Sequence, residues 1–301
     1  MSRPYTFLPP AGVRAYRLST ARGEFAVLDA APEGRPRGTA LLLPGFTGSK
    51  EDFIALHVPL AAAGYRTVAV DGRGQFETGG PRDDESAYAQ SELARDVLAQ
   101  AAAVGAPVHL VGHSLGGQIA RAAVLADPSP FVSLTLMASG PAQISESQQQ
   151  RVKLLRDALA VMGMAEVWEA IQAMEPPEET DTGGLDAGLS DLADLRRRWL
   201  GNSPAQLVAT GRQLCDEPDR VAELAAVPLP KHVISGQHDD TWPVSLLDTM
   251  AVRLDARRTV VEGAEHSPNA DQPLETARAL AGFWDGTRPA NTPDGPEPRG
   301  A

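Results

Sequence analysis

The chain has 301 residues, of which 39 are acidic and 27 are basic, so its formal net charge at pH 7 is −12. A protein this acidic repels phosphates, which argues against binding to nucleic acid or to an anionic membrane surface. Apolar residues make up 43% of the chain and charged residues 22%, as in folded globular proteins, and the one cysteine, Cys215, excludes an intrachain disulfide.

Short apolar runs alternate with helical patterns over the first half of the chain. This alternation predicts a mostly parallel sheet covered by helices, because parallel strands are usually joined by a helix that crosses the sheet. We predict strands at residues 13–18, 24–29, 39–43, 67–70, 107–111 and 131–137. Helices are predicted at residues 51–63, 86–104 and 115–126.

The alternation breaks after the sixth strand, where residues 141–227 are helical in pattern and show no convincing strand. Within them, the stretch 175–191 is acidic and interrupted by proline and glycine, which predicts a loop. Part of the negative charge is therefore concentrated in this stretch. Its acidic residues include Glu175, Glu178, Glu179, Asp181, Asp186 and Asp191.

The alternation of strands and helices resumes near the C-terminus, with strands at 231–235 and 258–261 and helices at 244–254 and 273–284. The residues that follow are rich in proline and are expected to be disordered. We therefore expect two segments of an α/β core, a helical cap between them and a tail. Their boundaries are 1–140 and 228–286 for the core, 141–227 for the cap and 287–301 for the tail.

A candidate nucleophile lies at residues 112–116, which read Gly-His-Ser-Leu-Gly. The pattern Gly-x-Ser-x-Gly suits a sharp turn from strand to helix, where the neighbours two positions from the serine must be small. The pattern is common by chance and gains its weight from context. A predicted strand precedes Ser114 and a predicted helix follows it, so we predict that Ser114 is a nucleophile.

With this motif in its context, the chain resembles the α/β-hydrolase fold superfamily, and within it bacterial serine hydrolases of the esterase and lipase kind. The resemblance covers residues 40–284. It implies an α/β fold with a mostly parallel central sheet flanked by helices, and a helical cap inserted after the sixth strand. It also implies that the nucleophile, the acid and the base follow one another in the order Ser, Asp or Glu, His.

A serine hydroxyl needs a base within hydrogen-bond reach, and the base needs a carboxylate that orients it. His266 lies in a turn after the last predicted strand, which resembles the family's catalytic-histidine loop. Residues 236–239 resemble the family's Gly-x-x-Asp turn, which makes Asp239 the candidate acid and the adjacent Asp240 the alternative.

The remaining histidines have structural interpretations. His57, His109 and His232 fall inside predicted elements, and His113 adjoins the nucleophile but is expected to face the other way along the turn. We find no cluster of histidine and carboxylate residues at a spacing suited to a metal ion, and expect neither a metal nor another cofactor.

The oxyanion of an acyl transfer needs preorganised N–H donors. The backbone N–H of Leu115 is one candidate, and the resemblance makes the backbone N–H of Phe46 the other. Family members usually carry His-Gly where this chain has Pro44-Gly45. Proline offers neither an N–H nor an imidazole, so we expect the hole to form from backbone groups on a less firmly braced loop.

Residues 71–74 resemble the family's Asp-x-Arg-Gly turn, whereas residues 75–78 depart from its usual small residues. Phe76, Trp168 and Trp242 are candidate residues of the substrate pocket. The run Arg196, Arg197 and Arg198 is interpreted as a solvated helix face.

We therefore predict a serine hydrolase that cleaves a carboxylic ester, or a related small acyl compound, through an acyl-enzyme. Two alternatives remain. The same fold could serve as a perhydrolase or haloperoxidase, as a C–C hydrolase or in biosynthetic acyl transfer or cyclisation, or it could bind a ligand without turnover. The acidic cap favours a neutral, apolar substrate. No secretory signal or membrane-spanning run is seen, so a cytoplasmic location is expected, and the oligomeric state stays open.

Overall fold

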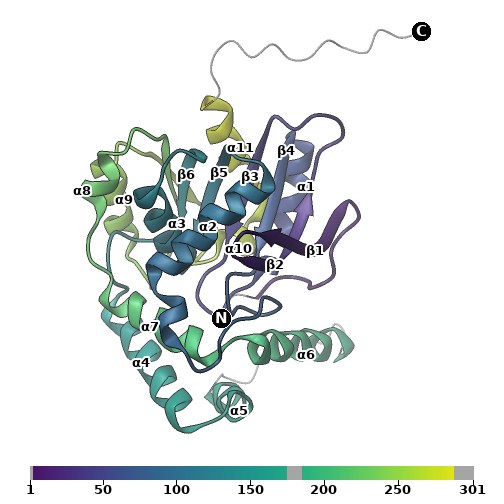
Figure 1. Cartoon of the computed structure of the whole chain (residues 1–301), viewed down its shortest axis with the longest axis vertical. Helices are drawn as coiled ribbons and strands as arrows, with labels where there is room; N and C mark the ends of the chain where they lie inside the picture. The colour runs from purple at the N-terminus through teal and green to yellow at the C-terminus, as the bar shows by residue number, and fades with distance from the viewer. Residues whose placement is uncertain (1–2, 175–184, 288–301) are drawn as a thin grey trace.

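The computed structural model describes residues 3–174 and 185–287, except for the side chains of residues 185–191. Within these residues, eight strands form one sheet in the order β1-β2-β4-β3-β5-β6-β7-β8 (Figure 1). Each strand predicted from the sequence is present. The strands are β1 (Val13–Thr20), β2 (Gly23–Ala30), β3 (Gly38–Leu43), β4 (Tyr65–Val70), β5 (Val108–His113), β6 (Phe131–Met137), β7 (Lys231–Gly236) and β8 (Arg257–Val261).

The sheet is parallel from β4 to β8, and only the β1–β2 hairpin at one edge runs antiparallel to its neighbours. Successive side chains of a strand point to opposite faces, so an apolar run buried on both sides needs helices on both sides. In β3, Leu41 and Leu43 belong to one buried cluster, and Ala40 and Leu42 belong to another. The predicted mostly parallel sheet is confirmed.

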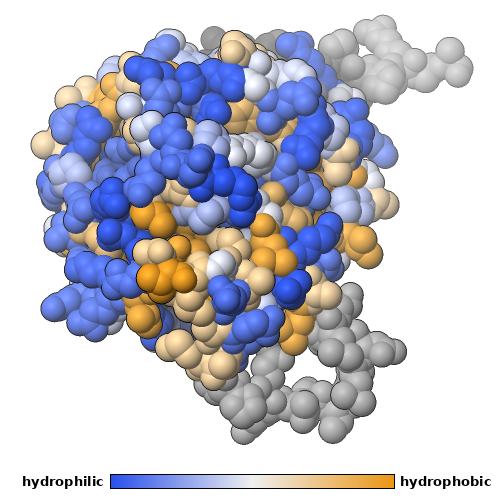
Figure 2. Space-filling model, turned by 60° about the horizontal axis from the view of Figure 1, so that its bottom comes forward, coloured by the Kyte–Doolittle hydropathy of each residue, from blue (hydrophilic) through white to orange (hydrophobic). Residues whose placement is uncertain are grey.

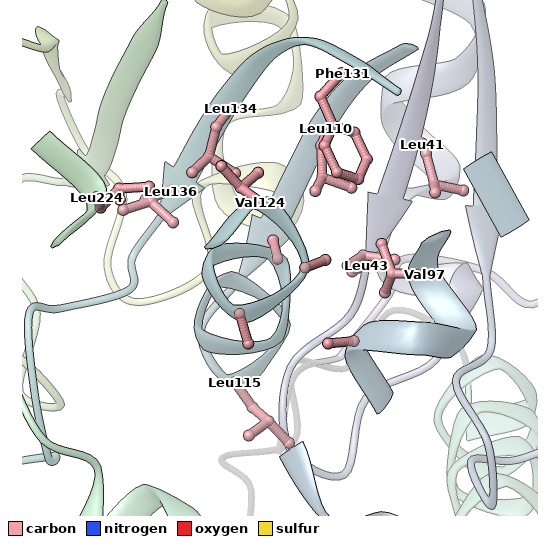
Figure 3. Close-up of a cluster of buried hydrophobic side chains, with 14 of the residues drawn as sticks. Leu41, Leu43, Val97, Leu110, Leu115, Val124, Phe131, Leu134, Leu136 and Leu224 are labelled. Carbon is pink, nitrogen blue, oxygen red and sulfur yellow. The ribbon is translucent and has the colours of Figure 1, made fainter. Parts of the chain in front are cut away.

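Helices cover both faces of the sheet. Figure 3 shows Leu41, Leu43 and Leu110 of the sheet meeting Val97 and Val124 of two covering helices. The helices on this face are α2 (Gln90–Val104), α3 (Leu115–Ala126), α8 (Val221–Ala225) and α9 (Val244–Arg253). The opposite face carries α1 (Ile54–Ala62), α10 (Pro268–Asp271) and α11 (Pro273–Gly286).

The chain between β6 and β7, which we call the insertion, is helical as predicted. In Figure 1, α4 to α7 gather below the sheet, and Figure 2 brings this end forward with apolar patches between hydrophilic ones. Trp168 and Trp199 of the insertion pack with Phe7 and Phe76 of the remaining chain in one buried cluster. The helices are α4 (Glu146–Val161), α5 (Met164–Met174), α6 (Leu185–Gly201) and α7 (Pro204–Asp216).

Two predicted elements differ from the structure. The helix predicted at 86–104 is broken at Ala89, whose ψ of 140° is extended, because a separate 3-10 turn (Glu85–Tyr88) is capped by Asp84. The acidic loop predicted at 175–191 is wrong for its second part, since residues 185–191 begin α6. Leucines at 185, 189 and 192 follow the helical period and continue into the rest of that helix.

The other acidic residues of that stretch, at 175–184, and the tail at 288–301 lie outside the described residues. In the described part of the chain, no helix combines the length and apolar character needed to cross a membrane.

Three histidines are buried within the fold and bond to hydroxyl groups. The Nδ1 of His57 lies 2.7 Å from Thr67 Oγ1, and that of His109 lies 2.8 Å from Ser133 Oγ. His232 Nε2 lies 2.9 Å from Thr259 Oγ1. Burial lowers the pKa of His57 and His109 to about 4 and the pKa of His232 to about 3.

These depressed pKa values predict that the protein loses stability in mild acid. Below pH 6.5 the unfolded chain protonates these imidazoles while the folded protein does not, so stability falls as the pH drops from 6.5 towards 4. Each histidine contributes up to about 1.4 kcal/mol per pH unit in this window. Urea unfolding between pH 7 and pH 4.5 measures the slope. His57→Gln should flatten it and Ser245→Ala, at an exposed residue without a titratable group, should not; equal slopes in the two variants would contradict this account.

Candidate active site

Ser114 lies between β5 and α3 in a backbone conformation that side chains rarely adopt, with φ of 54° and ψ of −119°. The close approach of the surrounding backbone explains the glycines around it. A Cβ at residue 112 would lie 2.3 Å from the Gly116 carbonyl oxygen, and a Cβ at residue 116 would lie 2.4 Å from the Leu43 carbonyl oxygen. Neither space admits another residue, so the turn holds the Ser114 hydroxyl in a strained and fixed place.

The structure brings Ser114, Asp239 and His266 together although 152 positions separate Ser114 from His266 in the sequence. The Ser114 Oγ lies 3.1 Å from Nε2 of His266. On the other side of the ring, Nδ1 lies 3.0 Å from each carboxylate oxygen of Asp239. The three side chains therefore form a continuous hydrogen-bonded chain, in which the imidazole faces both a hydroxyl and a carboxylate.

The carboxylate of Asp239 is held by its own loop. The backbone N–H groups of Thr241 and Trp242 donate to its Oδ1 over 2.8 and 3.1 Å, and the side chain is fully buried. The side chain of Asp240, by contrast, is 67% exposed and accepts a hydrogen bond from Gln148. Of the two candidate acids, the structure places Asp239 against His266 and directs Asp240 to the surface.

His113 contacts the same group of residues from behind. Its Nε2 lies 2.8 Å from the backbone oxygen of His266, and a carbonyl can only accept, so this nitrogen carries the proton. Complete burial, with the neighbouring His266 adding to it, lowers the pKa of His113 to about 4. A neutral His113 thus ties the elbow of Ser114 to the loop that presents His266.

The two candidate oxyanion donors come from different segments. Leu115 is the first residue of α3, so the helix itself provides no acceptor for its N–H. Phe46 lies in the loop after β3, and among the described residues no acceptor is found for its N–H. A Cβ at Gly45 would lie 3.1 Å from Cβ of Ser114, which places this loop directly against the nucleophile.

The loop after β3 has a brace that the sequence did not reveal. The side chain of Gln75 donates from Nε2 to the Gly45 carbonyl over 3.0 Å and accepts from the Gly72 N–H over 2.9 Å. Lys50, further along the loop, bonds to Asp71 through its backbone N–H and its ammonium group. The turn at residues 71–75 therefore supports the loop after β3, in which Pro44 stands where a histidine was expected from the resemblance.

A cavity of about 160 Å³ opens at Ser114 and receives walls from both the core and the insertion. Phe46 and Thr47 belong to the loop after β3, whereas Val152 and Leu214 belong to α4 and α7. Among the described residues that line it, Asp52 is the one carboxylate, and none is a lysine or an arginine. The lining residues are Gly45, Phe46, Thr47, Asp52, His113, Ser114, Ile144, Gln148, Val152, Leu214, Thr241, His266 and Ser267.

The three residues predicted for the substrate pocket do not line this cavity. Phe76 and Trp168 are buried in the cluster between the core and the insertion. Trp242 is fully buried, and its indole N–H donates to the backbone oxygens of Ala142 and Gln143. Large aromatic side chains near a site are frequently needed for packing, and here Phe76 and Trp168 pack between the core and the insertion while Trp242 bonds to the chain just after β6.

The interpretation of the arginine run as a solvated face is wrong for Arg198. Arg196 and Arg197 are about half exposed, but the side chain of Arg198 is fully buried and its Nη1 lies 2.8 Å from Oδ1 of Asp52. Asp52 was not singled out from the sequence. The spacing of Ser49 and Asp52 is typical of a helix start, and it is the one sequence signal by which Asp52 could have been found.

Among the described residues, no group of three or more histidine, cysteine, aspartate or glutamate side chains is arranged to hold a metal ion. The arrangement at Ser114 instead provides a hydroxyl, a base with its orienting carboxylate and two backbone donors. Together these groups can support nucleophilic attack and proton transfer.

In a comparison with protein families, the model of the alpha/beta hydrolase family matches residues 40–279 of the chain. Among characterised proteins, the chain is 29% identical over 237 residues to the pimeloyl-[acyl-carrier protein] methyl ester esterase of Aeromonas hydrophila subsp. hydrophila. That alignment covers 75% of this chain and 87% of the esterase. The chain is also 30% identical over 193 residues to a 2-hydroxy-6-oxononadienedioate/2-hydroxy-6-oxononatrienedioate hydrolase of Paraburkholderia xenovorans, covering 62% of this chain and 65% of that one.

Solved structures share the fold over nearly the whole chain. A membrane phospholipase A described as a bacterial virulence factor superposes with a TM-score of 0.72 at 27% identity, over 93% of this chain and 88% of the other. The predicted α/β-hydrolase fold, with a mostly parallel sheet flanked by helices, is thereby confirmed.

Proposed function

The chain belongs to the alpha/beta hydrolase family, and on this premise we propose that it is a serine hydrolase that cleaves small, neutral carboxylic esters. The observation that carries the proposal is the hydrogen-bonded chain from Ser114 through His266 to Asp239. A serine hydroxyl with a base in reach, and a base with an orienting carboxylate, is the arrangement that nucleophilic acyl transfer requires.

In the proposed mechanism, Ser114 Oγ attacks the carbonyl carbon of the ester while its proton moves to Nε2 of His266. Asp239 keeps Nδ1 of His266 protonated and stabilises the imidazolium. When the tetrahedral intermediate collapses, the leaving alkoxide takes the proton from His266, and an acyl group remains on Ser114. Water, activated by the same imidazole, then releases the acid and restores the serine.

The negative charge of the tetrahedral intermediate would lie between the N–H groups of Phe46 and Leu115. Preorganised donors of this kind are each worth about 10²–10³ in kcat. Support for this part of the proposal comes from three observations: Phe46 lines the Ser114 cavity, Leu115 directly follows Ser114 at the start of α3, and Gln75 braces the loop of Phe46.

The cavity supports a short and uncharged acyl group. If one heavy-atom group takes about 30 Å³, the share of a water molecule in the liquid, then 160 Å³ holds an acyl chain of roughly five such groups. Phe46, Ile144, Val152 and Leu214 supply apolar wall, and no lysine or arginine among the described lining residues is present to pair with a substrate carboxylate. We propose in addition that residues 141–227 act as a cap over this cavity and that the protein is cytoplasmic.

C–C hydrolysis is the second candidate, because two relatives are named 2-hydroxy-6-oxononadienedioate/2-hydroxy-6-oxononatrienedioate hydrolases. A dioate brings two carboxylates, which favour arginine or lysine in the site. Among the described residues, the lining of the cavity includes neither. The charge of the lining therefore favours a neutral ester over such a substrate.

A panel of p-nitrophenyl esters tests the proposed substrate class. We expect kcat/KM to peak between butanoate and hexanoate and to fall at least tenfold by dodecanoate. The succinate monoester should react about tenfold more slowly than the similarly sized pentanoate, which corresponds to about 1.4 kcal/mol. A preference for dodecanoate or for the succinate monoester would contradict this view of the cavity, and no hydrolysis of any ester would contradict the function itself.

A further inference from the structure

Asp52 lies where three parts of the molecule meet. It belongs to the 3-10 turn Lys50–Phe53 that follows the loop of Phe46, and it lines the cavity at Ser114. Its Oδ1 lies 2.8 Å from Nη1 of Arg198 in the insertion helix α6. The exposed fractions of the two side chains are 1% and 0%, so the ion pair is excluded from solvent.

On the side of the loop, the carboxylate packs directly onto the backbone. Its Oδ2 accepts the N–H of Ser49 over 3.2 Å, and the backbone N–H of Asp52 donates to the Ser49 carbonyl over 3.0 Å. A Cβ at Gly48 would lie 2.3 Å from the same Oδ2, and the Gly48 N–H closes the loop onto the Gly45 carbonyl. Phe46 lies within this closed loop, between Gly45 and Gly48. The position of the Asp52 carboxylate therefore limits where the N–H of Phe46 can point.

Asp52 is also joined to the segment that presents His266. The side chain of Asn269 donates to the backbone oxygen of Asp52 over 2.7 Å. Asn269 lies in α10, three residues after His266. The same residue thus connects the proposed oxyanion loop with the loop of the proposed base.

A buried carboxylate stays ionised only if a partner compensates for the lost hydration. Arg198 supplies that charge, and it comes from a helix 146 residues away in the sequence. The guanidinium reaches Asp52 only when α6 is seated on the core. Without it, the carboxylate would lose the guanidinium that fixes its Oδ1, and its hold on the Ser49 N–H through Oδ2 would weaken.

We infer that Asp52 and Arg198 are positioning residues for the oxyanion hole, so that the hole is complete only while the insertion is seated. This inference rests on the proposed function, since it assumes that the Phe46 N–H stabilises an oxyanion. Neither residue takes part in bond making or proton transfer. The effect of losing the pair should appear in kcat, where the transition state is stabilised, more than in KM.

The test compares Asp52→Asn with a matched variant at a second buried ion pair. Asparagine can still accept the Ser49 N–H but removes the negative charge with which Asp52 pairs to Arg198. We expect kcat for p-nitrophenyl butanoate to fall by about 10- to 100-fold, less than the roughly 10²–10³ for complete loss of an oxyanion donor because the Phe46 N–H is displaced rather than removed, and KM to change less than threefold.

Glu217→Gln is the matched control. Glu217 follows α7 and pairs with Arg121 of α3 over 2.7 Å, with exposed fractions of 4% and 2%, but it contacts neither the loop of Phe46 nor that of His266. We expect this variant to lower the thermal midpoint at least as much as Asp52→Asn while kcat stays within twofold of the parent. If Asp52→Asn also keeps the parent kcat, the pair is merely structural and the inference fails.

Arg198→Lys and Arg198→Met keep the inference testable if Asp52→Asn does not fold. Lysine preserves the charge and should retain kcat within about threefold, whereas methionine should lower it at least tenfold; equal kcat values in the two would overturn the inference.

Binding of a trifluoromethyl ketone, whose oxyanion occupies the hole, should weaken in step with kcat. Failure of the proposed function has a different signature, namely an unchanged rate in Ser114→Ala, whatever the result at Asp52.

Discussion

Replacing Ser114 by alanine is expected to lower kcat for p-nitrophenyl butanoate by about 10⁴- to 10⁶-fold, because no nucleophile remains to form the acyl-enzyme. The fold should tolerate the change, because alanine lacks only the side-chain oxygen of Ser114, which hydrogen-bonds to His266. Residual activity would come from the oxyanion donors and from substrate binding, which alone give about 10³–10⁴ over water. Initial rates at saturating ester measure the loss.

A covalent probe gives the same prediction a second readout. A fluorophosphonate should add one equivalent of mass to the parent protein and none to Ser114→Ala. Ser245→Ala, at an exposed serine of α9, is the control that should label and turn over like the parent. If Ser114→Ala keeps the parent rate, another group performs the chemistry. If the parent neither labels nor turns over any ester, the ligand-binding alternative gains support.

Replacing Asp239 by asparagine is the change with the next largest expected effect, a fall in kcat of about 10⁴-fold. The carboxylate accepts from Nδ1 of His266 and so keeps Nε2 free to receive the proton of Ser114. An amide in its place already meets the N–H groups of Thr241 and Trp242 with its oxygen and would turn its own N–H₂ towards the ring. That arrangement favours the wrong tautomer.

Asp240→Asn separates the two adjacent carboxylates. Its side chain is two-thirds exposed and bonds to Gln148, so we expect kcat within about threefold of the parent. Near-parent activity in Asp239→Asn together with a large loss in Asp240→Asn would reverse the assignment. A large loss in both would point to the loop as a whole rather than to one carboxylate.

The sequence predicted the parts of this molecule whose physical causes are local. The turn at Ser114 requires glycines at fixed spacing, and apolar runs between turn residues predict the strands. The candidates His266 and Asp239 followed from chain order and from turns that resemble those of the family. In each case a few consecutive residues determine the backbone, and the backbone determines where the side chain points.

The features that could not be predicted from the sequence depend on contacts between distant segments. Arg198 looks like its exposed neighbours Arg196 and Arg197, and nothing local indicates that it alone is buried against Asp52. Likewise, Gln75 appeared only as a departure from the usual pattern, although it braces the loop weakened by Pro44. Phe76 and Trp168 were expected at the ligand because aromatic residues suit both a pocket and a core, and sequence alone does not distinguish the two.

The shared walls of the cavity have a consequence for how substrate preference can change. The proposed reacting groups and oxyanion donors all belong to the sheet, its elbow and its loops, whereas Val152 and Leu214 belong to helices of the insertion. Changes at these two positions would resize the acyl site without touching a group that moves a proton. Selection or design can therefore change substrate preference through the insertion and leave the chemistry of the core unchanged. The exception is the Asp52–Arg198 pair, because it joins an insertion helix to the loop of Phe46.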